Sequence, residues 1–198
     1  MIKWRTRFGC QPDGFRTESR CSFGGQDPER VFDSLNLRSG DCFLDAGCGL
    51  GEYSLPAAER VGPTGAVIAL DRDPHMIRQL RRDANTSSVN NIMNLIATLG
   101  AQLPLRNQSA DVCLISSVLH MPGLDDRWDV LFSELHRVLH QGARLGIIEA
   151  HKSDVSPELP LHLRLTPETI ITGIQPYGFK WSGLIDLSSS YLVWFERV

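Results

Sequence analysis

The chain has 198 residues, of which 42% are hydrophobic and 22% charged, with a formal net charge of −3. A chain of this length can bury a core as one domain, and nothing in the bulk composition indicates a disordered, collagen-like or polyanion-binding protein. The sequence contains no apolar run of about 18 residues and no secretory signal, so a cytoplasmic protein without a membrane span is predicted.

The first 26 residues interleave basic and aromatic side chains ahead of the predicted domain, which runs from 27 to 198. Such a pattern can bind single-stranded nucleic acid, and it equally suits a lid that folds over a ligand pocket. The net negative charge of the chain argues against a nucleic-acid surface. Residues 1–26 are therefore predicted to form an N-terminal arm or lid.

From residue 27 onward, helical and strand patterns alternate along the chain. Asp27 and Pro28 are typical of a helix start, and they open a predicted helix at 27–37. Further strands are predicted at 42–46, 66–70, 94–99, 111–117 and 143–150, and further helices at 52–61, 74–84 and 126–139. Residues 179–198 hold two strand-like runs around a serine-rich turn, which is typical of an antiparallel pair. The expected fold class is α/β, a Rossmann-like doubly wound, mostly parallel seven-stranded sheet with a C-terminal antiparallel strand pair.

The segment LDAGCGLGEYS, residues 44–54, marks the passage from the first strand into the first helix. Ligands of open parallel sheets bind beyond the carboxyl ends of the strands, where this turn lies. Glycine allows positive φ and lets a ligand lie against the backbone, although any tight turn can use it. Pro56 fits only the first helical turn, so the helix is predicted to begin near Gly51 or Glu52. The three glycines of the turn itself are Gly47, Gly49 and Gly51.

Acidic residues near this turn narrow the class of ligand. Asp71 ends the second strand, where a carboxylate can accept both hydroxyls of a ribose; alternatively, it only prepares the start of the next helix. Glu52 stands where a dinucleotide turn of the form G-x-G-x-x-G has its third glycine. Carboxylates at Asp45 and Glu52 would repel a pyrophosphate and would favour an ammonium or a sulfonium. The pattern therefore favours a cationic nucleoside cofactor over a dinucleotide.

Together these segments resemble the class I S-adenosylmethionine-dependent methyltransferases, and within them the ubiquinone/menaquinone-biosynthesis-like branch of type 11. The similarity runs from about Asp27 to the C-terminus. It rests on LDAGCGLG, VIALDRD, SADVCLISSVLHM and HRVLHQGARLGIIE. The resemblance implies S-adenosyl-L-methionine as cofactor. The cofactor-binding residues that it implies are Asp45, Gly47, Gly49, Gly51, Asp71, Arg72, Ala101, Gln102, Ser116 and Ser117.

The resemblance also implies a role for each position. Asp45 and Gly47 are expected at the methionyl end, Asp71 at the ribose and Arg72 beside the adenine. Ser116 and Ser117 are expected to border the methionyl group. The chain departs from the family where an Asp-Ala-Glu-x-Leu-Pro pattern often precedes the fourth strand, because Leu99, Gly100 and Ala101 stand in the first three places. Adenine contacts in this loop are then expected from backbone groups or from Gln102.

His120 follows the fourth strand, where the resemblance places it near the transferred methyl group. Histidine titrates near neutral pH, so His120 is the candidate general base, with a simple wall of the pocket as the alternative. A metal site could be formed by Glu149, His151 and His162. Their spacing matches no recognised ligand set, however, so no metal is predicted. Cys10 and Cys21 alone do not establish thiol-dependent metalloid methylation.

The expected function is therefore methyl transfer from S-adenosylmethionine to a small-molecule acceptor by in-line displacement. A nicotinamide-dependent oxidoreductase is the rival within the fold class, and Glu52 disfavours it. A protein that binds the cofactor without catalysis is the rival from another class. The sequence does not identify the acceptor or the oligomeric state.

Overall fold

The computed structural model describes residues 27–152 and 159–198. The predicted N-terminal arm, with Cys10 and Cys21, lies outside these ranges. The strands are β1 (Cys42–Ala46), β2 (Ala66–Asp71), β3 (Ile92–Ile96), β4 (Ala110–Ser116), β5 (Leu139–Ala150), β6 (Phe179–Asp186) and β7 (Ser190–Arg197). The α-helices are α1 (Pro28–Ser34), α2 (Ser54–Val61), α3 (Pro74–Thr86), α4 (Trp128–Val138) and α5 (Pro167–Ile174). Three short 3-10 helices complete the described elements: η1 (Asp125–Arg127), η2 (Leu161–Leu163) and η3 (Gln175–Tyr177).

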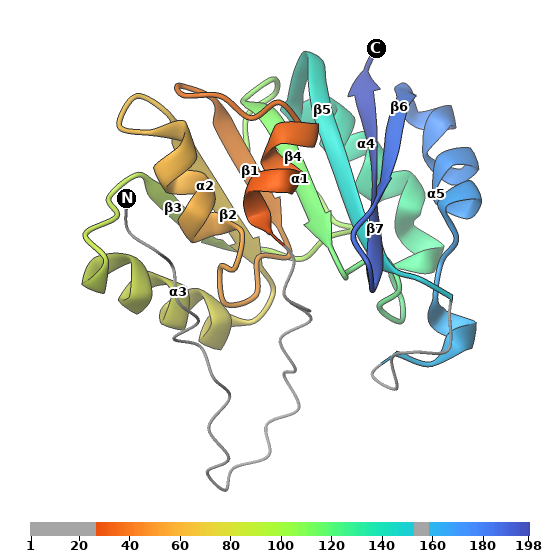
Figure 1. Cartoon of the computed structure of the whole chain (residues 1–198), viewed down its shortest axis with the longest axis horizontal. Coiled ribbons are helices and arrows are strands. Elements are labelled where there is room, and N and C mark those ends of the chain that lie inside the picture. Colours follow the sequence, from red (N-terminus) through yellow and green to blue (C-terminus); the bar gives the residue numbers. More distant parts are fainter. Residues whose placement is uncertain (1–26, 153–158) are drawn as a thin grey trace, which may run out of the picture.

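The strands form one seven-stranded sheet in the order β3-β2-β1-β4-β5-β7-β6 (Figure 1). The first five strands of this order pair in parallel, whereas β7 pairs antiparallel with both β5 and β6. The chain runs outward from β1 to β3 and then returns to the other side of β1 with β4. This reversal of strand order opens a crevice at the carboxyl ends of β1 and β4. The predicted fold class is confirmed.

Helices cover both faces of the sheet, and each face has its own apolar core. On one face, Phe32 of α1 packs edge-on against Phe43 of β1, beside residues of α2. On the other, Phe132 of α4 packs against Phe179 of β6 and the strands β4 and β5. These aromatic side chains are almost wholly buried, and each such burial stabilises the fold by about 1.5–3 kcal/mol.

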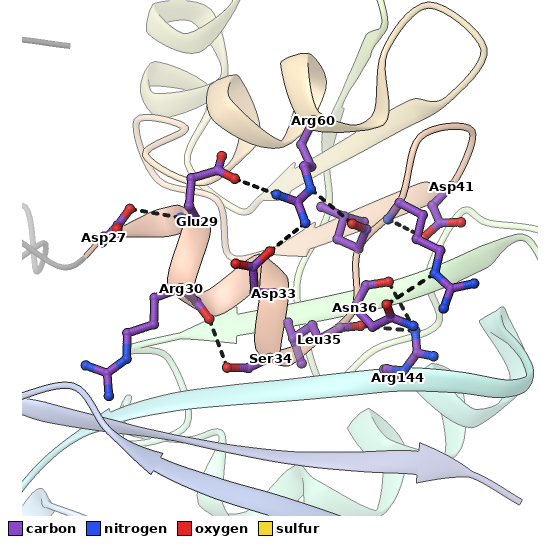
Figure 2. A network of polar contacts seen from close by, with 12 residues as sticks. Asp27, Glu29, Arg30, Asp33, Ser34, Leu35, Asn36, Asp41, Arg60 and Arg144 are labelled. Atoms are coloured by element: carbon purple, nitrogen blue, oxygen red, sulfur yellow. Dashed lines mark hydrogen bonds and ion pairs between the residues drawn. The ribbon is translucent and has the colours of Figure 1, made fainter. Parts of the chain in front are cut away.

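Two arginines contact α1 and the residues that follow it, one from α2 and one from β5 (Figure 2). Arg60 of α2 lies between Glu29 and Asp33, with both nitrogen–oxygen distances at 2.6 Å. Arg144 of β5 donates to the backbone oxygen of Leu35 at 3.1 Å, just beyond the end of the helix. The helix thereby links the part of the sheet around β1 to the part around β5.

Two predicted boundaries near the crevice were wrong. The third strand was predicted at 94–99, but β3 spans Ile92–Ile96, because its partner β2 ends at Asp71 and leaves the later residues without a neighbour. The first crossover helix was predicted to begin near Gly51 or Glu52, but α2 begins at Ser54. Gly51 has φ +85°, which no α-helical residue adopts, although its carbonyl already accepts the N–H of Leu55 at 3.0 Å.

Two further boundaries differ around α4. The helix predicted at 126–139 is divided into η1 and α4, and α4 ends at Val138. Leu139 is already extended and pairs with Ala110, so β5 starts earlier than the predicted 143. Within 27–152 and 159–198, no helix is long and apolar enough to cross a membrane.

Candidate functional site

The glycine turn is fixed to the end of β2 by backbone hydrogen bonds. The N–H groups of Gly47 and Cys48 both donate to the carbonyl of Leu70, at 2.7 and 2.9 Å. The next N–H, that of Gly49, donates to the Asp71 carboxylate at 2.9 Å. The turn and the tip of β2 therefore form one rigid unit, which sequence reasoning had proposed only as two neighbouring features.

The three glycines do different things, as the space around each shows. All have positive φ, so any side chain there would strain the backbone. A Cβ on Gly49 would meet nothing within 4 Å, whereas one on Gly47 would lie 2.6 Å from Val118 and one on Gly51 2.2 Å from Leu80. Gly49 thus presents bare backbone to open space. The missing side chain at Gly47 leaves room for Val118 of the loop after β4, and that at Gly51 leaves room for Leu80 of α3.

A cavity of about 490 Å³ lies beside this turn. Its volume falls within the usual range for small-molecule sites. Four segments line it: the turn, the tip of β2, residues 97–101 after β3, and residues 116–127 from the end of β4 to η1. Seven of the predicted site residues are among those that line it: Gly47, Gly49, Asp71, Arg72, Ala101, Ser116 and Ser117. The others, Asp45, Gly51, Gln102 and His120, do not line this cavity.

Asp45 lies beneath the turn, where it is only 2% exposed. It accepts a hydrogen bond from the Ser54 hydroxyl at 2.5 Å. Burial is the main cause that raises the pKa of Asp45 from 3.8 to about 7. The hydrogen bond from Ser54 lowers this pKa, whereas the negative charges of Asp71 and Glu52 raise it further. The carboxyl that presents its charge to the cavity is therefore Asp71 and not Asp45.

Both oxygens of the Asp71 carboxylate are held by backbone donors. One accepts from Gly49 N–H at 2.9 Å and the other from Asp73 N–H at 2.8 Å. Each carboxylate oxygen has a second lone pair, so further hydroxyl donors can still be accepted. The N-cap of α3 is Asp73, which accepts from His75 N–H at 2.7 Å. Asp71 is thus free of the helix-capping role that the sequence had left as an alternative.

Sequence reasoning missed the residues that close the far side of the cavity. Arg127 lines it and donates to the carbonyl of Gly100 at 3.0 Å. Ala97 and Thr98 also line it, because β3 ends before them. Arg127 ends η1, directly before α4, where the sequence predicted one continuous helix from residue 126.

The loop after β4 is strained and firmly anchored. Ser117 has φ 56°, an uncommon conformation for a residue other than glycine. Its N–H donates to the carbonyl of Ile148 at 2.8 Å, which ties the loop to β5. Ser116 hydrogen bonds to Tyr53, whose pKa is raised chiefly by burial. Strain of this kind persists where surrounding contacts enforce it, and it is common at functional sites.

His120 is paired with a buried acid on the neighbouring strand. Its Nδ1 lies 2.7 Å from Oε2 of Glu149, and the Glu149 side chain is wholly buried. The other oxygen, Oε1, accepts from Leu119 N–H at 2.9 Å. The His120 side chain keeps an exposed fraction of 13%. Sequence reasoning named both residues but did not bring them together.

The other histidines of the predicted acceptor side do not join this pair. His151 packs against Tyr191, with ring centroids 5.4 Å apart, and its Nε2 lies 3.6 Å from Asp186. His162 stands in η2. Across the residues that the structure describes, no three His, Cys, Asp or Glu side chains gather as a metal site would require.

Known proteins resemble this chain over about three fifths of its length. A demethylmenaquinone methyltransferase from Lactobacillus johnsonii is 30% identical over 122 residues, which cover 61% of this chain and 48% of that protein. An arsenite methyltransferase from Halobacterium salinarum is 29% identical over 122 residues, or 62% of this chain and 30% of that protein. The chain thus spans about half or less of the length of these relatives.

Solved structures share the fold at lower identity. A SAM-dependent methyltransferase from Aquifex aeolicus aligns with TM-score 0.80 and 23% identity, over 87% of this chain and 90% of that one. A geranyl diphosphate C-methyltransferase from Streptomyces coelicolor aligns with TM-score 0.71 and 16% identity, over 86% and 79%.

A family model described as "Methyltransferase domain" matches residues 44–147. That match begins in the first strand, includes the glycine turn and the pocket-lining loop after β4, and ends within β5. It confirms the resemblance to type 11, class I S-adenosylmethionine-dependent methyltransferases. Since the match covers more than half of the sequence, the chain belongs to the methyltransferase domain family.

Proposed function

We propose that the chain binds S-adenosylmethionine in the crevice beside the glycine turn and transfers its methyl group to a small-molecule acceptor by in-line displacement. One observation carries the proposal: the Asp71 carboxylate is locked to Gly49 N–H at the edge of a cavity onto which bare backbone opens. A nucleoside needs such a hydroxyl acceptor beside a backbone that it can approach closely.

The residues present fit this cofactor. Gly49 leaves room against the backbone, and Asp71 retains lone pairs for two ribose hydroxyls. Arg72 and residues 97–101 would hold the adenine, and Ser116 and Ser117 would border the methionyl end. Because Leu99 and Ala101 take the place of the acidic positions of the family pattern, backbone groups of this loop would supply the adenine contacts.

When bound, the cofactor supplies an electrophilic methyl group on a positively charged sulfur. The chain's own task is chiefly to align donor and acceptor. Alignment in a near-attack pose is worth about 7–11 kcal/mol of the barrier, so few catalytic side chains are needed. His120 is the proposed proton acceptor for substrates that lose a proton as they are methylated.

The acceptor is proposed as a small molecule. The relatives are named for demethylmenaquinone and for arsenite, two acceptors with little chemistry in common. The family match covers residues 44–147, which include the glycine turn and end within β5. Acceptor choice would therefore depend on segments outside that match.

Calorimetry on the whole chain tests cofactor choice. S-adenosylmethionine and its demethylated product S-adenosylhomocysteine should bind, and NAD should not, since Glu52 stands where a dinucleotide turn has glycine. Binding of NAD without binding of either adenosyl compound would establish the oxidoreductase alternative instead.

Transfer itself is tested with a labelled methyl donor. The whole chain would be incubated with a metabolite extract and, separately, with reduced demethylmenaquinone and with arsenite plus a thiol. Label in an organic or arsenical product demonstrates catalysis. If the chain binds S-adenosylhomocysteine but no labelled product forms, the result would favour a non-catalytic cofactor-binding protein.

A further inference from the structure

We propose that Glu149 is the positioning residue for His120, and that it fixes this histidine as a proton acceptor at the rim of the crevice, a role that rests on the proposed methyl transfer. Neither the family match, which ends at residue 147, nor the sequence pattern assigns Glu149 a role. The proposal stands on the contacts of the pair.

The fold presents Glu149 to the loop after β4 as a double acceptor. It lies near the end of β5, paired with Tyr191 of β7, and its side chain is fully buried. One oxygen accepts Leu119 N–H at 2.9 Å and the other faces Nδ1 of His120 at 2.7 Å. The hydroxyl of Tyr191 donates instead to the carbonyl of Leu165 at 2.9 Å, so it does not compete for this carboxylate.

These contacts decide which ring nitrogen carries the proton. A carboxylate can only accept, so Nδ1 must be the donor, and a neutral imidazole then has its free lone pair on Nε2. Among the described residues, the ring nitrogens of His120 have Glu149 as their single partner, and Nε2 is not among the buried unpaired atoms. The geometry thus leaves Nε2 accessible, with its lone pair free to accept a proton.

The position of His120 in the loop places it beside the cavity. Val118, two residues earlier, and Met121, the next residue, both line it. Ser117 N–H anchors the same loop to Ile148, next to Glu149 in β5. The loop and its histidine are therefore held by two adjacent residues of β5, while part of the His120 side chain stays exposed.

The proposed step is balanced in atoms and charge. For an acceptor X–H, a bond forms between X and the methyl carbon, and the electron pair of the broken carbon–sulfur bond stays on sulfur. The proton of X–H passes to Nε2 of His120. The positive charge then rests on the imidazolium, where Glu149 stabilises it through Nδ1–H.

Nitrogen NMR on the unmodified chain tests the tautomer directly. Long-range proton–nitrogen correlations, assigned with a His120→Gln variant, should show at neutral pH a protonated Nδ1 and an unprotonated Nε2 on His120. The opposite tautomer, with the proton on Nε2, would overturn the proposal.

Chemical modification tests whether Nε2 faces the bound cofactor. Diethyl pyrocarbonate acylates unprotonated imidazole nitrogen, and saturating S-adenosylhomocysteine should slow modification of His120 at least fivefold. The exposed residues His75 and His140 serve as internal controls whose rates should not change. Calorimetry of the same sample reports cofactor binding, so bound cofactor without protection of His120 overturns this inference and leaves the proposed function intact.

Glu149→Gln then tests the positioning residue. Glutamine keeps the shape but can donate as well as accept, so both tautomers of His120 should become populated while affinity for S-adenosylhomocysteine stays within about threefold. Glu196→Gln, on the exposed side of β7, is the matched control and should leave the tautomer unchanged. An unaltered tautomer in Glu149→Gln would show that Glu149 does not set it. Should this variant fail to fold, the two measurements on the wild-type chain still decide the proposal.

Discussion

Two buried acids near the ends of β1 and β5, the parallel strands on either side of β4, have opposite surroundings. Asp45, in β1, accepts the neutral hydroxyl of Ser54 and is penalised by burial, which raises its pKa to about 7. Glu149, in β5, accepts a backbone N–H and faces the ring of His120. Burial alone therefore does not decide the role of a carboxyl group. Its hydrogen-bonding partners also determine how well the charged form is stabilised.

The same contrast separates the two sides of the crevice. Around β1 and β2 the site consists mainly of backbone: the N–H groups of a glycine-rich turn, held in place by the Asp71 carboxylate. Around β5 it consists of side chains that distant parts of the chain bring together, such as His120 and Glu149. The first arrangement suits a cofactor common to many enzymes, and the second can vary with the acceptor.

The largest expected effect is that of Asp45→Asn on stability at alkaline pH. The folded chain binds a proton at Asp45 up to about pH 7, whereas the unfolded chain releases it near 3.8, so burial of the charged form costs stability above pH 7. The difference of about 3 pH units, at about 1.4 kcal/mol each, sets an upper bound of about 4 kcal/mol. The asparagine variant should be the more stable at pH 8, with the advantage fading as pH falls from 7 to 4.

Urea unfolding at several pH values measures this advantage as the difference between variant and wild type. Asp126→Asn, an exposed acid that precedes α4, is the control and should follow the wild-type pH dependence. Parallel curves for Asp45→Asn and wild type would mean that the Asp45 carboxyl ionises as freely in the folded chain as in the unfolded one.

The next effect concerns cofactor affinity. Asp71→Ala should weaken S-adenosylhomocysteine binding about 100-fold, or about 2.7 kcal/mol, because two ribose hydroxyls lose a charged acceptor and Gly49 N–H loses its anchor. Calorimetry provides the measurement. Asp73→Ala is the matched control, since it removes only the N-cap of α3 and should cost about 1 kcal/mol of stability with affinity kept within about threefold. If both variants lost similar affinity for S-adenosylhomocysteine, the ribose would not be bound by Asp71.

The sequence predicted what depends on local pattern. Alternating helices and strands, Pro56 near a helix start, and an acid at the tip of β2 are signals within a few residues, and they placed the parallel sheet and the glycine turn correctly. Family resemblance rested on the same local motifs, which is why it named Asp71 and the glycines.

What the sequence did not show depends on contacts between distant residues. Gly51 makes room for Leu80, Arg127 reaches Gly100, and Glu149 meets His120, across separations of about thirty residues. The end of β3 was misjudged for the same reason, because β2 sets it by ending at Asp71. The hydrophobic periodicity of one strand does not indicate where the neighbouring strand of the sheet ends.

The smallest expected effects are those of replacing the two arginines that join α1 to α2 and to β5. Arg60 pairs with exposed acids, Glu29 and Asp33, and such surface pairs contribute about 0–1 kcal/mol (Figure 2). Arg144 donates to the backbone carbonyls of Leu35 and Asn36, which its loss would leave without this donor. Thermal unfolding should show a loss of about 0.5–1 kcal/mol for Arg60→Gln and about 1–2 kcal/mol for Arg144→Gln.

Salt separates the two contributions, because it screens ion pairs but not a hydrogen bond to a carbonyl. In about 1 M sodium chloride the effect of Arg60→Gln should shrink by half or more, leaving mainly its bond to the Leu37 carbonyl at 3.1 Å. The effect of Arg144→Gln should persist. If salt erased both effects equally, Arg144 would act through charge, and the β5 side would hold α1 in the same way as the β1 side.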